Sequence, residues 1–187
     1  ALAGLTPVPP ALALLVTVLP EPLGVTVAEP AGPRCATDPV ITRALLVQGA
    51  SRWLHEPWTA LVVRTLPNEP AKRERQYAGG CPAPYFTPEA MRWVVERAVT
   101  SLVVDLPSLD RADDGGALAA HRLYWGLPAG SLDATEARRG AALVTELAYV
   151  PDSAADGLYL LDLHVPAFAA DAAPSRPVLY PLTEAAP

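Results

Sequence analysis

The 22 prolines in this chain of 187 residues limit where helices and strands can run. Proline fixes its own backbone φ and has no N–H to donate, so it rarely sits inside a helix or a central strand. Here the prolines fall mainly between apolar, β-branched runs, which are typical of strands. These runs predict six strands, at Leu12–Val18, Ala60–Leu66, Ser101–Leu106, Leu143–Ala148, Leu158–Val165 and Pro177–Leu182.

Two helices have clear start signals in the sequence. Asp38 and Pro39 offer an N-cap and a first-turn proline, and Gly49 is a suitable end for the same helix. Thr87 and Pro88 repeat the start signal, and apolar residues then recur on one face at helical spacing. Two further helices are predicted, one within Ala117–Trp125 and a weaker one around Asp133–Ala142.

Length and charge narrow the fold class and the function classes. With these strands and helices, residues 1–187 predict a single α/β domain with a mixed sheet and flanking helices. The formal net charge of -6 argues against a nucleic-acid partner, because phosphate binding needs clustered Lys and Arg. The apolar stretch Ala11–Leu19 is far shorter than the ~20 residues of a membrane helix. It also lacks the preceding basic segment of a signal peptide, so we expect neither a membrane partner nor export.

The cysteines and the chain ends add further expectations. Cys35 and Cys81 form neither a CxxC pair nor a disulfide-dense pattern. Reduced thiols in a cytoplasmic protein are therefore expected, with one disulfide as the alternative. The tail at residues 185–187 is expected to be frayed. The chain begins with Ala1 rather than Met, which suggests an N-terminally incomplete domain.

Oxygen and nitrogen donors gather in the second half of the sequence. Asp105 ends an apolar strand, where a carboxylate needs a partner; it is either an acceptor for the turn at Pro107 and Ser108 or part of a site. Glu146 interrupts the apolar run LVTELAYV, so it either faces water on a sheet edge or points into a site. His121 is either a structural histidine or a ligand, and with one carboxylate it makes half of a Zn or Mn shell. The other donors in this region are Asp110, Asp113 and Asp114, the last two most simply a solvated turn.

Several common catalytic motifs do not occur in the sequence. There is no GxGxxG or GxxxxGK[ST] phosphate loop, no GxSxG elbow and no HExxH. Nucleotide binding and serine-hydrolase chemistry therefore have no local support. The other two histidines stand alone; His55 is expected in a loop, and His164, on an apolar strand, is expected to be buried.

Four segments follow one another in a distinctive order: YFTPEAMRWVVERAVTSLVVDLPSLDR, AHRLYWG, ALVTELAYVPDSAADGLYLLDLHVPAF and DAAPSRPVLYPL. Over about residues 58–182 this order resembles the putative cyclase family, which includes bacterial kynurenine formamidase and isatin hydrolase. A helix leads to a strand that ends in a turn like the family's D-T-P-S-V-D, here Asp105-Leu106-Pro107-Ser108-Leu109-Asp110. A histidine, a strand bearing glutamate and a final strand pair then follow.

The resemblance implies a swivelling β/β/α fold and metal-dependent hydrolysis of a C–N bond in an aryl formamide, a lactam or a related small amide. In this chemistry the metal polarises the carbonyl and lowers the pKa of bound water toward ~7. The implied metal is Zn or Mn, its ligands are His121 and Glu146, and the supporting residues are Asp105, Ser108, Asp110 and Trp125.

The family's metal-binding run, His-x-Gly-Thr-His-x-Asp-x-Pro-x-His, has no counterpart in this sequence. That run supplies most metal ligands and the proton-transfer histidine, so no catalytic residue is assigned. We therefore expect this chain to supply only part of the site and to be inactive alone. Missing strands would leave sheet edges uncovered, which favours a homo-oligomer. The alternative is a non-catalytic binding or scaffold protein that keeps the fold without the metal.

Overall fold

The computed structural model describes residues 8–24, 36–77, 83–128, 131, 133–168 and 172–182. The predictions for Cys35, Cys81 and the tail lie outside these residues. In chain order the elements are β1 (Ala11–Val18), β2 (Glu21–Pro22), β3 (Pro39–Ile41), α1 (Arg43–Ala50), β4 (Ala60–Thr65), β5 (Tyr85–Phe86), α2 (Pro88–Glu96), β6 (Ser101–Val104), α3 (Ala119–Trp125), β7 (Leu143–Thr145), β8 (Gly157–His164) and β9 (Arg176–Pro181), with 3-10 turns at Ser51–Trp53, Pro70–Glu74 and Ala134–Glu136.

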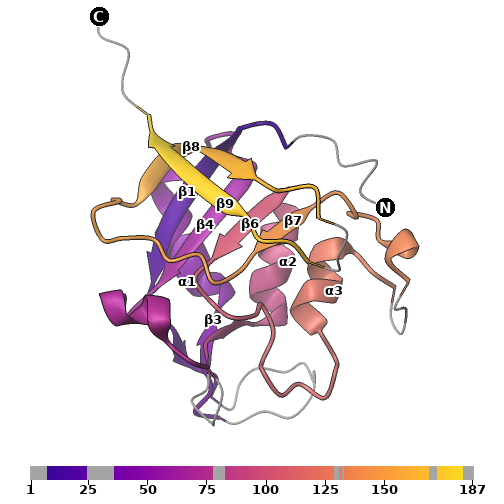
Figure 1. Cartoon of the computed structure of the whole chain (residues 1–187). Coiled ribbons are helices and arrows are strands. Elements are labelled where there is room, and N and C mark those ends of the chain that lie inside the picture. The colour runs from indigo at the N-terminus through magenta and orange to yellow at the C-terminus, as the bar shows by residue number, and fades with distance from the viewer. Residues whose placement is uncertain are drawn as a thin grey trace, which may run out of the picture.

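A six-stranded mixed sheet organises the molecule, with strand order β7-β6-β4-β1-β8-β9. Strands β1, β4, β6 and β7 are parallel to one another, and β8 and β9 add an antiparallel hairpin beside β1. The helices lie behind this sheet, and the β8–β9 hairpin curls across its front (Figure 1). Strands β2, β3 and β5 form a second, small sheet. The prediction of an α/β fold with a mixed sheet and flanking helices is confirmed.

Each predicted strand is present, and the burial of two of them follows the sequence pattern. Every residue of β4 and β6 is buried, as their near-continuous apolar runs predict. Side chains alternate across the sheet, so each strand contributes to two apolar layers. Leu14, Leu61 and Leu102 pack with the helices, whereas Leu15, Val62 and Val103 form a layer on the front of the sheet.

One helix matches its prediction closely, and two predictions are corrected. Thr87 caps α2, where its side chain accepts a hydrogen bond from the Ala90 N–H. The helix predicted to start at Asp38 instead starts at Arg43, because the residues after Asp38 pair as β3 with β2 and β5. Around Asp133–Ala142 only one 3-10 turn forms. No helix among the described residues has the length and apolarity needed to cross a membrane.

Candidate functional site

The carboxyl ends of three neighbouring strands meet at one edge of the sheet. β4, β6 and β7 run parallel, with Thr65 ending β4, Asp105 following β6 and Glu146 following β7. In α/β sheets, ligands bind at this edge, outside the carboxyl ends of the strands. Both Asp105 and Glu146 therefore stand where the fold can build a site.

His121 lies between two carboxylates above this edge. Its Nδ1 is 2.6 Å from Asp110 Oδ2, and its Nε2 is 3.4 Å from Glu146 Oε1. The imidazole is 16% exposed, so water has limited access to it. The fold thus brings His121 and Glu146 together, although each belongs to a different element.

Asp110 fixes the position of His121 through the backbone as well as the ring. Its Oδ1 accepts a hydrogen bond from the Ala120 N–H at 2.6 Å, and its Oδ2 accepts one from the His121 N–H at 3.1 Å. The residue before α3, Leu118, has a left-handed backbone and no capping side chain, so Asp110 replaces the missing cap. Ser108 in turn accepts a hydrogen bond from the Asp110 N–H at 3.1 Å. Ser108 therefore supports the turn that carries Asp110.

The sheet breaks at the point where Glu146 stands. The strand ends at Thr145 rather than at Ala148 as predicted, and Leu147 has a left-handed φ of 56°. The Ala148 N–H nevertheless donates to the carbonyl of Val104, so pairing with β6 resumes after an irregular step. An irregular step of this kind changes the direction in which a side chain points. Glu146 accepts a hydrogen bond from the Leu109 N–H at 3.0 Å. It also lines a cleft of about 390 Å³.

Trp125 covers one side of the histidine. Its ring centroid lies 5.3 Å from that of His121, with the planes tilted by 38°. The indole N–H donates to the carbonyl of Ala142 at 2.9 Å, which holds the ring in place. Since Trp125 is one helical turn after His121, the spacing on α3 explains this contact.

The two carboxylates keep the histidine charged. Burial lowers the pKa of His121, but its hydrogen bonds and charge interactions with Asp110 and Glu146 together raise that pKa to about 9. At neutral pH the ring therefore carries a proton on each nitrogen. A protonated imidazole cannot bind a metal, so a cation at Nε2 would have to displace that proton.

Asp105 belongs to a separate buried cluster at the same edge. Its carboxylate lies 2.7 Å from Lys72 Nζ, and both side chains are at most 5% exposed. The carboxylate also accepts hydrogen bonds from the N–H and hydroxyl of Thr65, at 2.8 and 2.9 Å. The first of the two interpretations of Asp105, an acceptor for the turn at Pro107 and Ser108, is therefore not what the structure shows. Sequence reasoning missed Lys72, because nothing local links a lysine in a polar loop to a carboxylate on another strand.

The donor set is too small for a complete metal centre. No group of three or more His, Cys, Asp and Glu side chains placed to hold a metal ion occurs in the part of the chain that the structure describes. Asp110 takes the Nδ1 side of His121, which leaves His121 Nε2 and Glu146 as possible ligands. A hydrolytic zinc usually has three protein ligands. The described residues alone therefore do not fit a resident metal.

The two other histidines lie away from this cluster. His55 is exposed in a turn, as expected. His164 is also exposed, with its side chain 55% accessible and paired with Asp162 at 2.9 Å, so the prediction of burial is wrong. The reason is that alternate residues of β8 face opposite sides, and Leu161 and Leu163 take the buried side.

Comparison with known proteins gives a likeness at the level of fold. No protein-family model matches the sequence, and no curated protein matches it either. Among solved structures, a predicted metal-dependent hydrolase from Bacillus stearothermophilus has a TM-score of 0.53 at 13% identity, over 95% of this chain and 68% of that chain. A potential metal-dependent hydrolase with cyclase activity has a TM-score of 0.52 at 11% identity, over 91% of this chain and 64% of that chain.

These likenesses establish the fold alone. An isatin hydrolase bound to a product analogue has a TM-score of only 0.47 at 15% identity, over 84% of this chain and 55% of that chain, too weak to support an argument. The chain spans about two thirds of the length of the two hydrolases named first. It therefore shares the α/β fold of proteins described as metal-dependent hydrolases.

Proposed function

We propose that the chain serves a metal-dependent hydrolase that cleaves a C–N bond in a small amide, an aryl formamide or a lactam, and that it supplies part of the metal site. The observation that carries this proposal is the meeting of His121 Nε2 and Glu146 Oε1, 3.4 Å apart at the carboxyl edge of a hydrolase-like sheet. An imidazole nitrogen and a carboxylate oxygen are suitable ligands for Zn or Mn.

The roles of the remaining residues follow from their contacts. Asp110 would hold the ring of His121 with Nε2 toward Glu146, as carboxylates behind metal-bound histidines do. The Leu109 N–H would fix one oxygen of Glu146. Further ligands would have to come from outside the described residues, so no catalytic step is assigned to this chain alone.

The cleft beside Glu146 supports a small substrate. It holds about 390 Å³, near the lower end of the range for small-molecule sites. Its walls carry small or aliphatic side chains such as Val144, Leu147 and Ala148. A single-ring amide matches these dimensions better than a peptide does.

Metal analysis of variants tests the proposal. The protein would be purified after expression with Zn or Mn, and its metal content measured by mass spectrometry for the wild type, His121→Ala and Glu146→Gln. Where further ligands from outside the described residues complete the site, as proposed, the wild type should contain bound metal and each variant should lose most of it. His164→Ala is the matched control, because His164 also pairs with a carboxylate but lies on β8. Equal metal content in all four proteins would remove the basis of the proposal.

A specific observation favours a second function, that of a non-catalytic binding protein. Both nitrogens of His121 already have carboxylate partners, and the raised pKa keeps the ring protonated without any metal. In that case the wild type would contain no metal, and His121→Ala would lower the free energy of unfolding instead. The same set of purified variants therefore distinguishes the two functions.

A further inference from the structure

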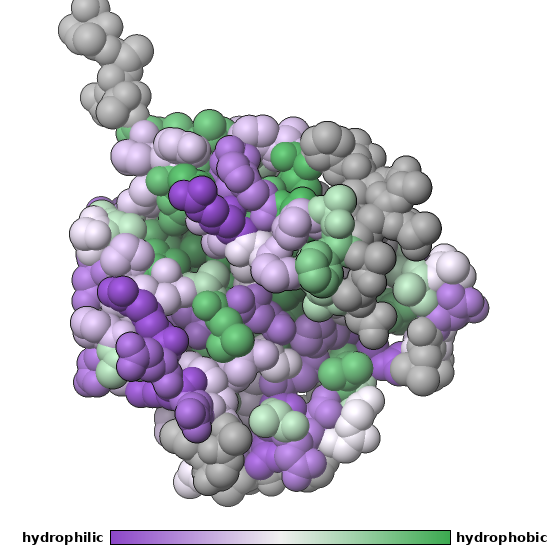
Figure 2. All heavy atoms as spheres, viewed as in Figure 1, coloured by the Kyte–Doolittle hydropathy of each residue, from purple (hydrophilic) through white to green (hydrophobic). Residues whose placement is uncertain are grey.

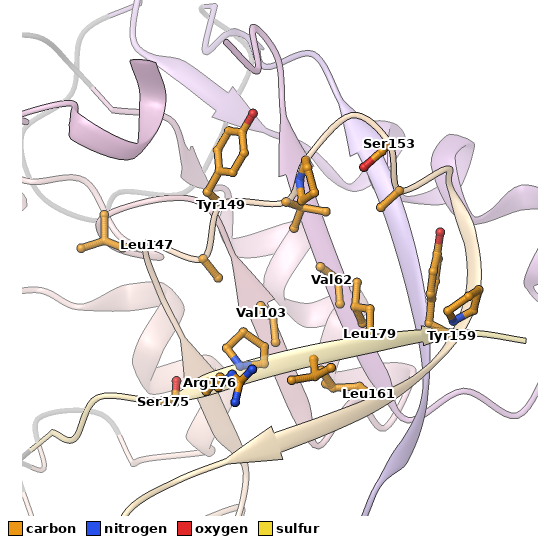
Figure 3. A pocket seen from close by; sticks show the side chains of 17 residues that line it. Val62, Val103, Leu147, Tyr149, Ser153, Tyr159, Leu161, Ser175, Arg176 and Leu179 are labelled. Carbon is orange, nitrogen blue, oxygen red and sulfur yellow. The ribbon is translucent and has the colours of Figure 1, made fainter. Parts of the chain in front are cut away.

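A walled apolar groove lies on the front of the sheet, on the face opposite the helices. Its volume is about 700 Å³, within the range of small-molecule sites. The floor is formed by Val62 on β4 and Val103 on β6, and the β8–β9 hairpin adds Leu161 and Leu179 (Figure 3). In the space-filling view of this face, apolar atoms lie in a hollow with polar residues around it (Figure 2).

Residues 147–154 form one wall of the groove, and Arg64 holds this wall in place. Arg64 follows Val62 by two residues on β4, so it faces the same side of the sheet. Its guanidinium donates to the carbonyls of Pro151 and Ala154, both at 2.8 Å. It also pairs with Asp156 at 3.1 Å, and its side chain is 8% exposed. These contacts fix the end of the wall nearest β8.

A second set of contacts fixes the middle of the same wall. The side-chain amide of Asn68 donates to the carbonyl of Val150 at 2.9 Å and to the carboxylate of Asp152 at 2.6 Å. The Ala148 N–H donates to the carbonyl of Val104 at 2.9 Å. Because the wall is anchored by polar contacts at both ends and in the middle, the groove is already formed without a ligand. Such a wall cannot easily collapse onto the apolar floor.

We propose that this groove binds an uncharged, hydrophobic small molecule of one or two rings. Its floor is aliphatic, and the polar side chains that line it are mainly hydroxyls, those of Tyr149, Ser153, Tyr159 and Ser175. Among the described lining residues only Arg176 is charged, and it is exposed at the start of β9. Transfer of a neutral apolar molecule from water to this floor is favourable, whereas a charged group would lose its hydration.

The neighbouring strand argues against a peptide or a second copy as the ligand. A peptide that binds a sheet edge needs backbone donors there. Strand β9 is the edge strand beside the groove, and two of its six residues are Pro177 and Pro181, which have no N–H. A small molecule needs no such donors. The groove shares Leu147, Ala148, Ser175 and Pro177 with the cleft beside Glu146. The proposal nevertheless does not rest on the hydrolase function, because it concerns binding without metal or reaction.

Fluorescence with the neutral probe N-phenyl-1-naphthylamine tests this site. We expect saturable binding of the probe by the full chain. In Leu179→Trp, where the larger side chain fills the groove, the dissociation constant should be at least about tenfold higher, a loss of about 1.4 kcal/mol. Leu160→Trp is the matched control. Leu160 lies on β8 next to Leu161, but its side chain points to the face of the sheet opposite the groove and is 37% exposed. It should bind the probe like the wild type.

A second measurement needs no variant. In methyl NMR spectra of the wild type, the probe should shift the signals of Val62, Val103, Leu161 and Leu179 and leave that of Leu160 unchanged. The proposal is overturned if the wild type does not bind the probe, if both Trp variants lose binding equally, or if the shifted methyls lie elsewhere. Tighter binding of the anionic 8-anilinonaphthalene-1-sulfonate than of the neutral probe also contradicts it. Dimerisation that increases with protein concentration and covers these methyl groups would also contradict the proposal.

Discussion

Asp110 holds His121 twice, with one carboxylate oxygen 2.6 Å from the ring Nδ1 and 3.1 Å from the backbone N–H. The same carboxylate takes the place of the missing N-cap of α3. One residue therefore sets both where the helix starts and which way its histidine points. This double role makes Asp110 the most sensitive position of the candidate site.

Asp110→Asn should destabilise the protein by about 2 kcal/mol, because it weakens charge-assisted hydrogen bonds to the helix start and to the ring. The substitution should also lower the pKa of His121, since the nearer of its two carboxylates is lost. Urea denaturation and an NMR titration of the ring would measure the two effects. Asp113→Asn is the control, because Asp113 lies in the same loop and is exposed. An unchanged ring titration in Asp110→Asn would contradict the assignment.

The stability contributed by His121 should depend on pH in the alkaline direction. Its pKa is about 9 in the folded protein and about 6.5 in the unfolded chain, so folding favours the protonated ring. The contribution is complete below about pH 6.5, decreases as pH rises, and is lost above about pH 9. Its full size is up to about 3 kcal/mol. The difference in unfolding free energy between wild type and His121→Gln, measured at pH 6 and pH 10, should shrink accordingly; a difference that grows with pH would contradict this sign.

Lys72→Met should cost about 3–5 kcal/mol, because it leaves the carboxylate of Asp105 buried without a countercharge. The double variant Lys72→Met with Asp105→Leu should recover part of this loss, since both charges are then removed. Arg75→Met serves as the control, because Arg75 is exposed in the same segment. Equal urea midpoints for the two single variants would show that the buried pair contributes nothing.

The 187-residue chain alone should not hydrolyse aryl formamides when Zn or Mn is added. The reason is that its described residues provide only two ligands, His121 Nε2 and Glu146, for a metal that usually needs three. A continuous absorbance assay with N-formylaniline would test this. Turnover that disappears in Glu146→Gln would show that the chain completes its own site.

The fold was predictable where local signals and tertiary contacts agree. The capping chemistry at Thr87 and the apolar runs of β4 and β6 pointed to the observed elements, because burial on both faces leaves its mark on every residue of a strand. The helix-start signal at Asp38 failed, because the residues that follow it, Pro39–Ile41, pair with β5, which lies far along the chain. The exposure of His164 could have been predicted, because Asp162 and His164 alternate with leucines along the strand.

The candidate site was predictable only in its parts. A carboxylate in an apolar run marked Glu146 as either exposed or part of a site. Its position near His121 was implied only by the family resemblance. The proton that Asp110 and Glu146 hold on the ring, and the partner of Asp105, depend on distances that no local pattern encodes. The homo-oligomer, the amide substrate and the identity of the metal stay predictions.

The left-handed backbone of Leu147 has a consequence for how this protein can change. Leucine occupies that conformation at a cost, and its side chain is 64% exposed, so packing does not explain its presence there. Glycine or asparagine at this position would relieve the cost, whereas valine or isoleucine would resist the turn and swing the preceding carboxylate away from α3. The backbone conformation of Leu147, a residue without any polar atom in its side chain, thus determines the orientation of Glu146.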